Sequence, residues 1–249
     1  MTVSVKAKGR ALCFAYGDER IRFTRVPRPA TEDSVLIKVH PDCSVVVAAP
    51  EQVTDDAVLA AAKKRQRWIF QKLRDFREQE SHVVPRSYIS GESHLYLGKR
   101  YQLKVLVTKN RPQGVRLTRG QLETTVQRKN AEFIRDTLKE WYRDRARHVF
   151  GTRLDALLEQ ALWVTEKPSL SIRVMNSQWG SCSPSGRILL NLNLVKAPRD
   201  CIDYVILHEL CHIAEHNHSE KFYRLMRQVM PNWEGTKFRL DDLAGKLLQ

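Results

Sequence analysis

The chain has 249 residues, of which 42% are hydrophobic and 28% charged, with a formal net charge of +14. This composition is ordinary for a soluble globular protein, and the length allows one large or two small hydrophobic cores. No apolar run approaches the roughly 18 residues of a transmembrane helix. The N-terminal segment also lacks the apolar stretch of a secretory signal. We therefore predict a cytoplasmic protein with no membrane partner.

The basic residues gather in two regions, residues 63–74 ("KKRQRWIFQKLR") and residues 99–150. Such positive fields attract polyanions, so nucleic acid bound through a basic surface is one candidate partner. A solvated charged helix face is the simpler interpretation. The five cysteines form no C-x-x-C pair, which indicates reduced thiols and neither a disulfide framework nor a cysteine zinc knuckle.

The predicted elements place strands first and helices later. Strand-like alternation runs through residues 11–50, and residues 54–80 form one predicted helix that Thr54 can cap. Residues 82–127 return to strands and turns, which we expect to form hairpins with the first sheet. A long amphipathic helix over about residues 130–160 follows, with a break expected near Gly151.

Two strands around a Ser-Pro-Ser-Gly turn come next, in residues 171–195, and three further helices begin after Pro198, near Ser219 and after the Met-Pro-Asn-Trp segment. The sequence thus predicts an α+β protein with a strand-rich N-terminal region, residues 1–120, and a second domain, residues 121–249. The join lies between residues 85 and 130, where no Gly/Ser-rich linker marks it.

The stretch "VILHELCHIAEHNHSEKF", residues 205–222, carries the chemistry. His208, Glu209 and His212 form an H-E-x-x-H motif in a predicted helix. Residues four apart lie on one helix face, so the two imidazoles can bind one metal ion. Glu209 lies about 100° further round the axis, where it avoids coordination and can contact a metal-bound water instead.

A third protein ligand must come from Glu215, His216 or His218. In a continued helix His216 would lie about 12 Å along the axis from His208, too far for bonds of about 2.1 Å to one ion. We interpret it as a polar surface residue. His218 reaches the ion only if the chain turns back, and the expected turn uses left-handed Asn217 and a helix cap at Ser219. The predicted ligands are therefore His208, His212 and His218.

These motifs resemble those of the YgjP-like metallopeptidase family, the bacterial domain of unknown function forty-five. The matching segments are Trp179–Ser183, Leu190–Leu194, Ala197–Pro198, Ile202–His212, Asn217–Phe222 and Met230–Pro231. The resemblance implies a zincin-like core of the minigluzincin or SprT-like type, in which a small sheet packs on the H-E-x-x-H helix. Cys43 and Tyr223 stand where the family commonly has glycine and tryptophan, and the resemblance does not fix the substrate.

The segment "SQWGSCS" has two interpretations in that fold. As part of a substrate cleft, Trp179 forms a wall, Gly180 lets a substrate backbone approach, and Ser181 or Cys182 hydrogen-bonds the substrate or the ligands. Alternatively it is a packed turn around a buried tryptophan. We do not expect Cys182 to be catalytic, because a thiolate beside zinc would ligate it and occupy the water position.

The predicted function is metal-dependent hydrolysis, most naturally of a peptide bond, with Glu209 as general base toward a metal-activated water. Three histidines suit Zn²⁺, and also Mn²⁺ or Ni²⁺, better than Mg²⁺. Three alternatives remain open. The site could hydrolyse nucleoside triphosphates attracted by the basic surface, it could act as a SprT-like protease on nucleic-acid-bound proteins, or it could be a structural zinc module with a fourth protein ligand.

Overall fold

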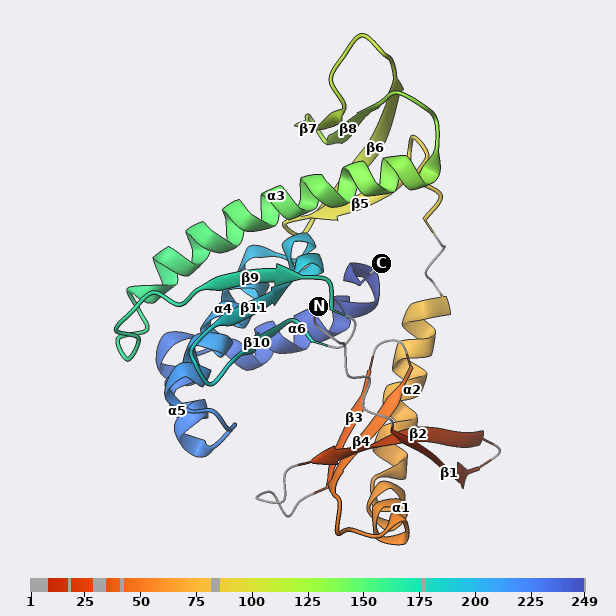
Figure 1. The fold of residues 1–249 in the computed structure, drawn as a ribbon, viewed down its shortest axis with the longest axis vertical. Coiled ribbons are helices and arrows are strands. Elements are labelled where there is room, and N and C mark those ends of the chain that lie inside the picture. The colour runs from red at the N-terminus through yellow and green to blue at the C-terminus, as the bar shows by residue number, and fades with distance from the viewer. Residues whose placement is uncertain are drawn as a thin grey trace, which may run out of the picture. The chain divides into compact units, whose positions relative to one another are not determined.

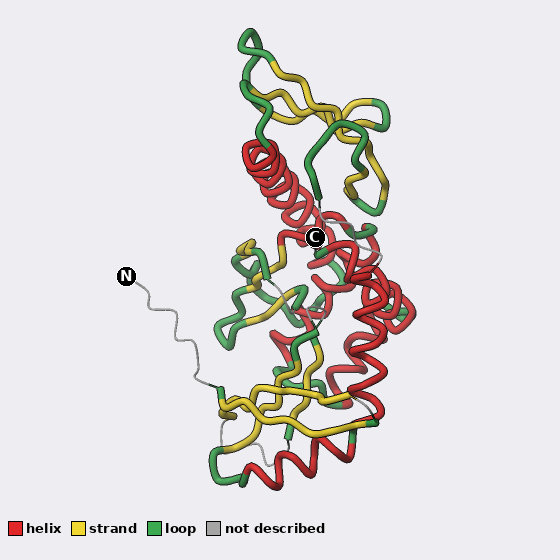
Figure 2. The backbone as a smooth tube through the Cα atoms, turned by 90° about the vertical axis from the view of Figure 1, so that its right-hand side faces the viewer, coloured by secondary structure: helices red, strands yellow, loops and turns green. Residues whose placement is uncertain are grey.

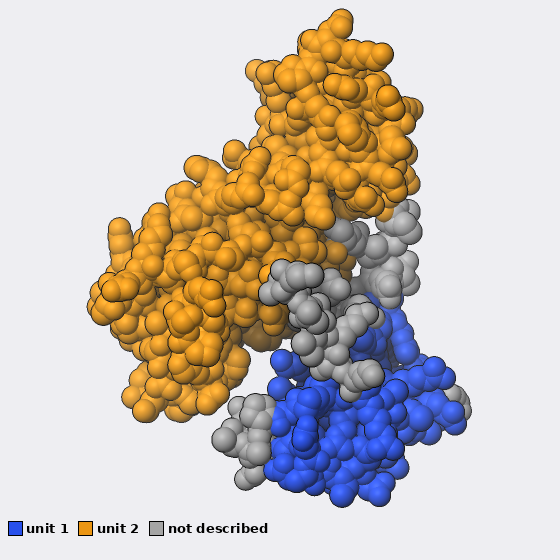
Figure 3. Space-filling model, in the orientation of Figure 1, with its two compact units in different colours: residues 1–83 blue, residues 84–249 orange. Residues whose placement is uncertain are grey.

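The computed structural model describes residues 9–17, 19–28, 35–40, 43–81, 86–175 and 178–248. The chain divides into two compact units, residues 1–83 and residues 84–249 (Figure 3). The boundary expected at residue 120 instead falls inside the second unit, because residues 114–118 and 121–126 pair as one hairpin. No helix among the described residues is long and apolar enough to cross a membrane.

The first unit is a four-stranded sheet with two helices. Its strands are β1 (Arg10–Tyr16), β2 (Glu19–Arg28), β3 (Leu36–Val39) and β4 (Val45–Pro50), in the order β1-β2-β4-β3. Helices α1 (Asp55–Lys64) and α2 (Gln66–Ser81) cover the sheet through Val58, Ala62, Ile69 and Leu73 (Figure 2). The single helix expected over residues 54–80 is therefore two helices, with a turn at Arg65 whose N–H donates to the carbonyl of Ala62.

The second unit opens with its own four-stranded sheet, in the order β5-β6-β8-β7 (Figure 1). Its strands are β5 (Ser93–Tyr96), β6 (Lys99–Val107), β7 (Gly114–Thr118) and β8 (Gln121–Val126). The expectation that this segment would form hairpins with the first sheet was wrong. Leu103, Leu122 and Val126 bury themselves against helix α3 instead.

Helix α3 (Ala131–Leu158) runs without interruption for 28 residues. The break expected at Gly151 is absent. A Cβ at Gly151 would meet no atom within 4 Å, so this glycine is not a site of close approach. Tertiary packing outweighs its weak helix propensity, since Phe150 and Leu154 on either side are fully buried.

The turn between β5 and β6 connects the first sheet of this unit to the segment that leads into the H-E-x-x-H helix. Leu97 and Gly98 donate their backbone N–H groups to the carbonyls of Val195 and Lys196, each at 3.0 Å. Gly98 has φ +77°, and a Cβ there would lie 2.9 Å from the ring of Pro198. The glycine is thus required both by the turn and by its contact with Pro198, the residue before the helix.

A second, three-stranded sheet in the order β10-β11-β9 consists of β9 (Leu170–Arg173), β10 (Gly180–Cys182) and β11 (Ile188–Asn191). A short 3₁₀ helix, η1 (Leu192–Lys196), leads from it to α4 (Arg199–Ala214), which contacts α3, β10, α5 (Glu220–Val229) and α6 (Trp233–Leu247). Nine of the sixteen residues of α4 are buried. A helix that is apolar on most sides belongs in the centre of a core, and these mixed sheets and helices confirm the α+β class.

Asn191 joins the second sheet to the chain before β10. It is fully buried, and its Nδ2 donates to the carbonyls of Met175 and Gln178 at 2.7 and 3.0 Å. We expect Asn191→Ala to lower the free energy of unfolding by about 2–5 kcal/mol, because each buried carbonyl left unpaired costs about 1–3 kcal/mol. Urea denaturation measures this. Asn193→Ala, at a half-buried position two residues on, should cost less than about 1 kcal/mol, and equal losses would contradict the assignment.

Candidate metal centre

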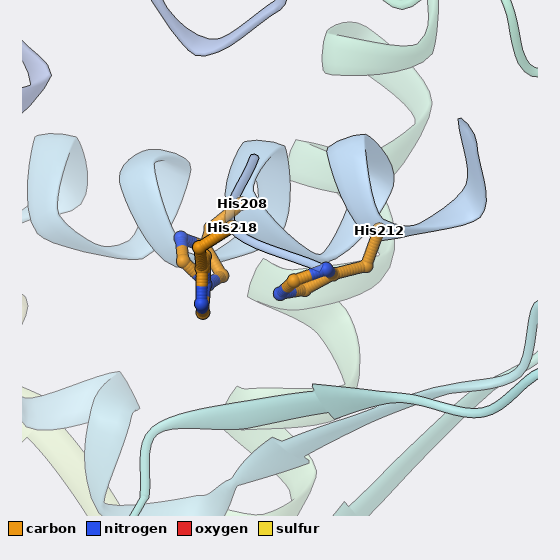
Figure 4. A group of neighbouring side chains, drawn as sticks. All are labelled: His208, His212 and His218. Atoms are coloured by element: carbon orange, nitrogen blue, oxygen red, sulfur yellow. The ribbon is translucent and has the colours of Figure 1, made fainter. Parts of the chain in front are cut away.

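Three imidazole rings converge beside helix α4. His208 and His212 extend from the same side of α4, and His218 meets them from the segment after it (Figure 4). Each offers a ring nitrogen, and these three nitrogens lie within 4.8 Å of one another. Nε2 of His218 is 3.0 Å from Nε2 of His208. Bonds of about 2.0–2.1 Å place neighbouring ligand nitrogens about 3–4 Å apart. The His208–His218 pair has about this spacing, and the three nitrogens are close enough together to hold one ion after a small adjustment of the rings.

A backbone hydrogen bond fixes the tautomer of His212. Its Nδ1 lies 3.0 Å from the carbonyl oxygen of Glu215. A carbonyl can only accept, so Nδ1 carries the proton and the lone pair is on Nε2. Metal-ligating histidines commonly use such an outer partner to orient the ring and keep one nitrogen available.

The charge state of the imidazoles also suits a metal. Burial, together with neighbouring His212 and His218, lowers the pKa of His208 to about 3. Burial lowers the pKa of His212 as well. Both rings are therefore neutral at physiological pH, which is the form that binds a metal ion.

The chain turns back earlier than the sequence predicts. Helix α4 ends at Ala214, and Glu215 follows in an extended conformation with φ −134°. The expectation that Asn217 adopts a left-handed conformation was wrong, since Asn217 is not among the described residues with positive φ. In its extended conformation, Glu215 directs its carbonyl toward His212. The end of α4 and the orientation of the His212 ring therefore depend on the same residue. The expected cap at Ser219 is present and accepts the N–H of Phe222 at 3.3 Å.

Phe222 forms the apolar support of the three rings, a role the sequence analysis missed. Its ring centroid lies 4.9, 4.7 and 4.7 Å from those of His208, His212 and His218, and its side chain is 1% exposed. Phe222 lies four residues after His218 and close to the Ser219 cap. This spacing predicts a contact between the two side chains, because residues four apart meet at the start of a helix.

Further aromatic rings continue outward from the histidines. Tyr223 stacks on His218 with 6.2 Å between ring centroids, and Trp233 stacks on Tyr223 at 5.5 Å. Tyr204, one turn before His208 on α4, contacts both His208 and Trp233. These rings pack around the histidines in sequence, and the four-residue spacing of Tyr204, His208 and His212 predicts their common face.

Glu209 lies in a dry environment beside the ligands. Its side chain is 4% exposed, and its Oε2 has no hydrogen-bond partner among the described residues. Burial raises its pKa from 4.5 to about 8. An unpaired buried carboxyl is costly for the fold, so its presence points to a functional role, and a dication bound nearby would favour its ionised form.

Strand β10 approaches Glu209 at Gly180. A Cβ on Gly180 would lie 2.6 Å from Oε1 of Glu209, so only glycine leaves room for this carboxyl group. One of the two sequence-based interpretations of this segment places a substrate backbone at Gly180, and neither predicts this contact. Ser181 pairs with Leu189 of β11 and is half-buried, as are Cys182 and Trp179. The pKa of the Cys182 thiol is raised by burial and by Glu209, which keeps it in the unreactive thiol form.

The remaining sequence candidates lie apart from this cluster. Trp179 packs against the main core of the unit, and the ring contacts described for the histidines do not include it. His216 is exposed and does not belong to the three-histidine group. Cys211 is fully buried.

Helix α4, its H-E-x-x-H residues and the returning His218 define a candidate centre of the metallopeptidase class. A family model, described as the YgjP-like metallopeptidase domain, matches residues 33–243. The chain therefore belongs to the YgjP-like metallopeptidase family, which implies a metal cofactor and peptidase activity.

A search of curated proteins gives no match. Among solved structures, the crystal structure of the metallopeptidase zymogen of Pyrococcus abyssi abylysin is similar, with 20% identity and a TM-score of 0.35. The similarity covers 36% of this chain and 90% of that chain.

The close approach of Gly180 to Glu209 gives a stability prediction. Gly180→Ala should lower the free energy of unfolding of the metal-free protein by about 1–3 kcal/mol, because the added methyl group forces the strand or the carboxyl group to shift. Ser181→Ala on the same strand is the matched control and should change it by less than about 1 kcal/mol. Chemical denaturation of both variants tests this, and a Gly180→Ala protein as stable as wild type would contradict the packing.

The raised pKa of Glu209 gives a pH prediction for the metal-free protein. Between pH 4.5 and about 8 the folded state keeps a proton that the unfolded state has lost, so the stability supplied by this group falls as pH rises through that window. Wild type should therefore lose stability relative to Glu209→Gln, by at most about 1.4 kcal/mol per pH unit. Urea midpoints at several pH values, with chelator present, measure the difference, and two parallel curves would contradict it.

Proposed function

We propose that the chain is a zinc-dependent peptidase with a zincin-like core, in which His208, His212 and His218 hold the metal and Glu209 is the general base. The observation that carries the proposal is the convergence of three imidazoles beside one buried carboxyl group whose Oε2 has no hydrogen-bond partner among the described residues. Every residue of this site lies in the second unit, residues 84–249, which we propose as catalytic.

The donor set supports zinc. Three imidazole nitrogens and a fourth position left to water form the usual arrangement of catalytic zinc sites, and Mn²⁺ or Ni²⁺ would also accept these ligands. When bound, such an ion lowers the pKa of a water molecule towards 7 and polarises the scissile carbonyl. A structural zinc module is disfavoured, because it normally has four protein ligands and only three group together among the described residues.

Glu209 is suited to move a proton. It follows His208 on the helix, so its carboxyl group is beside the ligands without joining them. Oε2 has no other hydrogen-bond partner in the described protein, so it can accept a proton from the attacking water and pass it to the leaving amine. Gly180 keeps this carboxyl group against the strand, and the buried setting limits competing hydrogen bonds from solvent.

The neighbouring strand supports an extended peptide as substrate. Within the described part of the chain, β10 is an edge strand of its sheet and pairs with β11 on one side. An edge strand can add one more strand through its backbone, which recognises a peptide largely without regard to sequence. We place the substrate backbone along Gly180 and Ser181, with Trp179 as a wall at the start of the strand.

The nucleotide and nucleic-acid hypotheses rest on net charge alone. Nothing in the site geometry adds to them, so we propose neither as the function of this centre.

Metal analysis tests the ligand assignment. We expect about one zinc per wild-type chain and a loss of affinity of at least about a hundredfold in His218→Ala, since removing one of three ligands removes a large share of the binding free energy. His216→Ala, two residues away and exposed, is the matched control and should bind zinc like wild type. Equal binding by both variants would contradict the assignment of His218.

Hydrolysis of a quenched-fluorescent peptide library tests the general base. Glu209→Gln should keep its zinc and lose at least about a hundredfold in kcat, because general-base catalysis contributes about 10²–10⁴. Glu220→Gln, an exposed acid in the first turn of α5, is the control and should retain activity. A fully active Glu209→Gln protein would remove Glu209 from the mechanism.

A further inference from the structure

The segment of residues 99–129 is strongly basic and includes no residue of the metal centre. It holds nine lysines and arginines and one acid, Glu123. The segment forms β6, β7, β8 and the turns that join them. β7 and β8 lie on the side of α3 away from α4 (Figure 1). The proposed peptidase chemistry therefore leaves this concentration of charge unexplained.

Most basic side chains of this segment lack carboxylate partners. Lys104 pairs with Glu123 at 3.4 Å. The other eight are exposed, and none of them forms an ion pair with another described residue. Helix α3 differs, because Arg135, Arg143 and Arg147 each pair with an aspartate or glutamate of the same helix. A surface that serves only solubility mixes both signs of charge. The segment instead presents an uncompensated positive field, which attracts polyanions.

Several of these cations share one face of the sheet. Leu103 of β6 and Leu122 of β8 are buried in the core that the sheet forms with α3. Because side chains alternate along a strand, the neighbours of these leucines point to the opposite face. Arg100 and Lys104 of β6 lie on that face, and Arg116 of β7 lies across β8 from Lys104. All three of these basic side chains are exposed.

The turns extend this positive face at both ends of the strands. β6 and β8 run parallel, so the turn after β6, with Lys109 and Arg111, lies at the same end of the sheet as Arg128 and Lys129 after β8. Arg119, in the turn between β7 and β8, lies at the other end. Strands of 6 and 9 residues separate these ends by about 20–30 Å. The cations therefore cover a distance that suits a chain of phosphates better than one small anion.

A hollow beside the turn between β7 and β8 adds a surface for a planar ring. Its volume is 820 Å³, and its lining includes Tyr101, Arg119 and Gln121. Tyr101 is half-buried, so part of its ring is open to contact. Bases of single strands stack on tyrosine rings and on arginine guanidinium planes, and polar side chains hydrogen-bond their edges. Positive charge alone suits an acidic protein equally well, and the hollow favours a nucleic acid whose bases are free to stack.

We propose that this face of β6–β8, together with its turns, binds single-stranded nucleic acid. The phosphates lie along Arg100, Arg116, Arg119 and the cations of the turns, and one base fills the hollow against Tyr101. Contacts with phosphates carry no sequence information, so the binding depends weakly on sequence. The proposal is independent of the peptidase function, because it uses no residue of the metal centre.

Fluorescence anisotropy tests the proposal, with the full chain titrated into a labelled deoxythymidine strand of about twenty nucleotides at several salt concentrations. We expect saturable binding whose logarithm falls with that of the salt concentration by about 0.7 for each neutralised phosphate. The triple variant Arg100→Gln, Arg116→Gln, Arg119→Gln should bind at least about tenfold more weakly, with a slope shallower by about 2, because three phosphate contacts are lost. Its three positions are exposed, so it should fold like wild type.

The triple variant Arg135→Gln, Arg143→Gln, Arg147→Gln on α3 is the matched control. It removes the same net charge from outside the proposed face, so it should bind the strand within about threefold of wild type. Equal losses of affinity in the two triple variants would show an effect of net charge alone and would overturn the proposal. Absence of binding at about 50 mM salt would overturn it as well.

Competition experiments distinguish a single strand from other polyanions. Unlabelled polyglutamate and duplex DNA of the same length should displace the labelled strand at least about fivefold less effectively than the unlabelled strand, because neither offers free bases to the hollow. Tyr101→Leu keeps an apolar side chain and should weaken binding of the strand at least about fivefold. Equal or better competition by polyglutamate or the duplex, or wild-type affinity in Tyr101→Leu, would contradict the assignment to a single strand.

Discussion

The return of the chain between α4 and α5 is the constraint on which the metal centre depends. One helix can bring only two imidazoles to an ion, because a third at the next turn lies too far along the axis. The backbone of Glu215 both allows the third imidazole to approach and orients the ring of His212. Its extended conformation ends α4 and starts the return that brings in His218, and its carbonyl fixes the proton of His212.

Hydrogen bonds that fix α4 stabilise the arrangement of the three histidines. Trp163 donates its indole N–H to the carbonyl of Leu210 at 2.8 Å, and Arg153 forms two hydrogen bonds with Asp203 at 2.7 and 2.8 Å. These contacts fix two points along the helix, while its apolar residues fill the core. The same burial isolates Glu209 from water. The fold therefore carries, at a cost in stability, a buried carboxyl group whose Oε2 has no hydrogen-bond partner among the described residues, as functional sites often do.

The sequence predicts the centre of the site better than its surroundings. H-E-x-x-H and the Ser219 cap depend on spacings of a few residues, so helix geometry excludes His216. It leaves His218 as the candidate ligand on the condition that the chain turns back, and the residue that makes this turn was not predicted correctly. The contact of Gly180 with Glu209 joins residues far apart in sequence, and no local pattern reveals it. The partner of each strand likewise depends on long-range packing, which is why β5–β8 were expected in the wrong sheet. At Gly151, the weak helix propensity of glycine is outweighed by the burial of Phe150 and Leu154 on either side.

The X-ray absorption spectrum of the zinc-loaded protein tests the central claim most directly, because it counts the atoms bound to the metal. We expect three imidazole nitrogens and one oxygen, at about 2.0–2.1 Å. A sulfur neighbour at about 2.3 Å, or a fourth imidazole, would contradict it, because the position required for the attacking water would then belong to the protein.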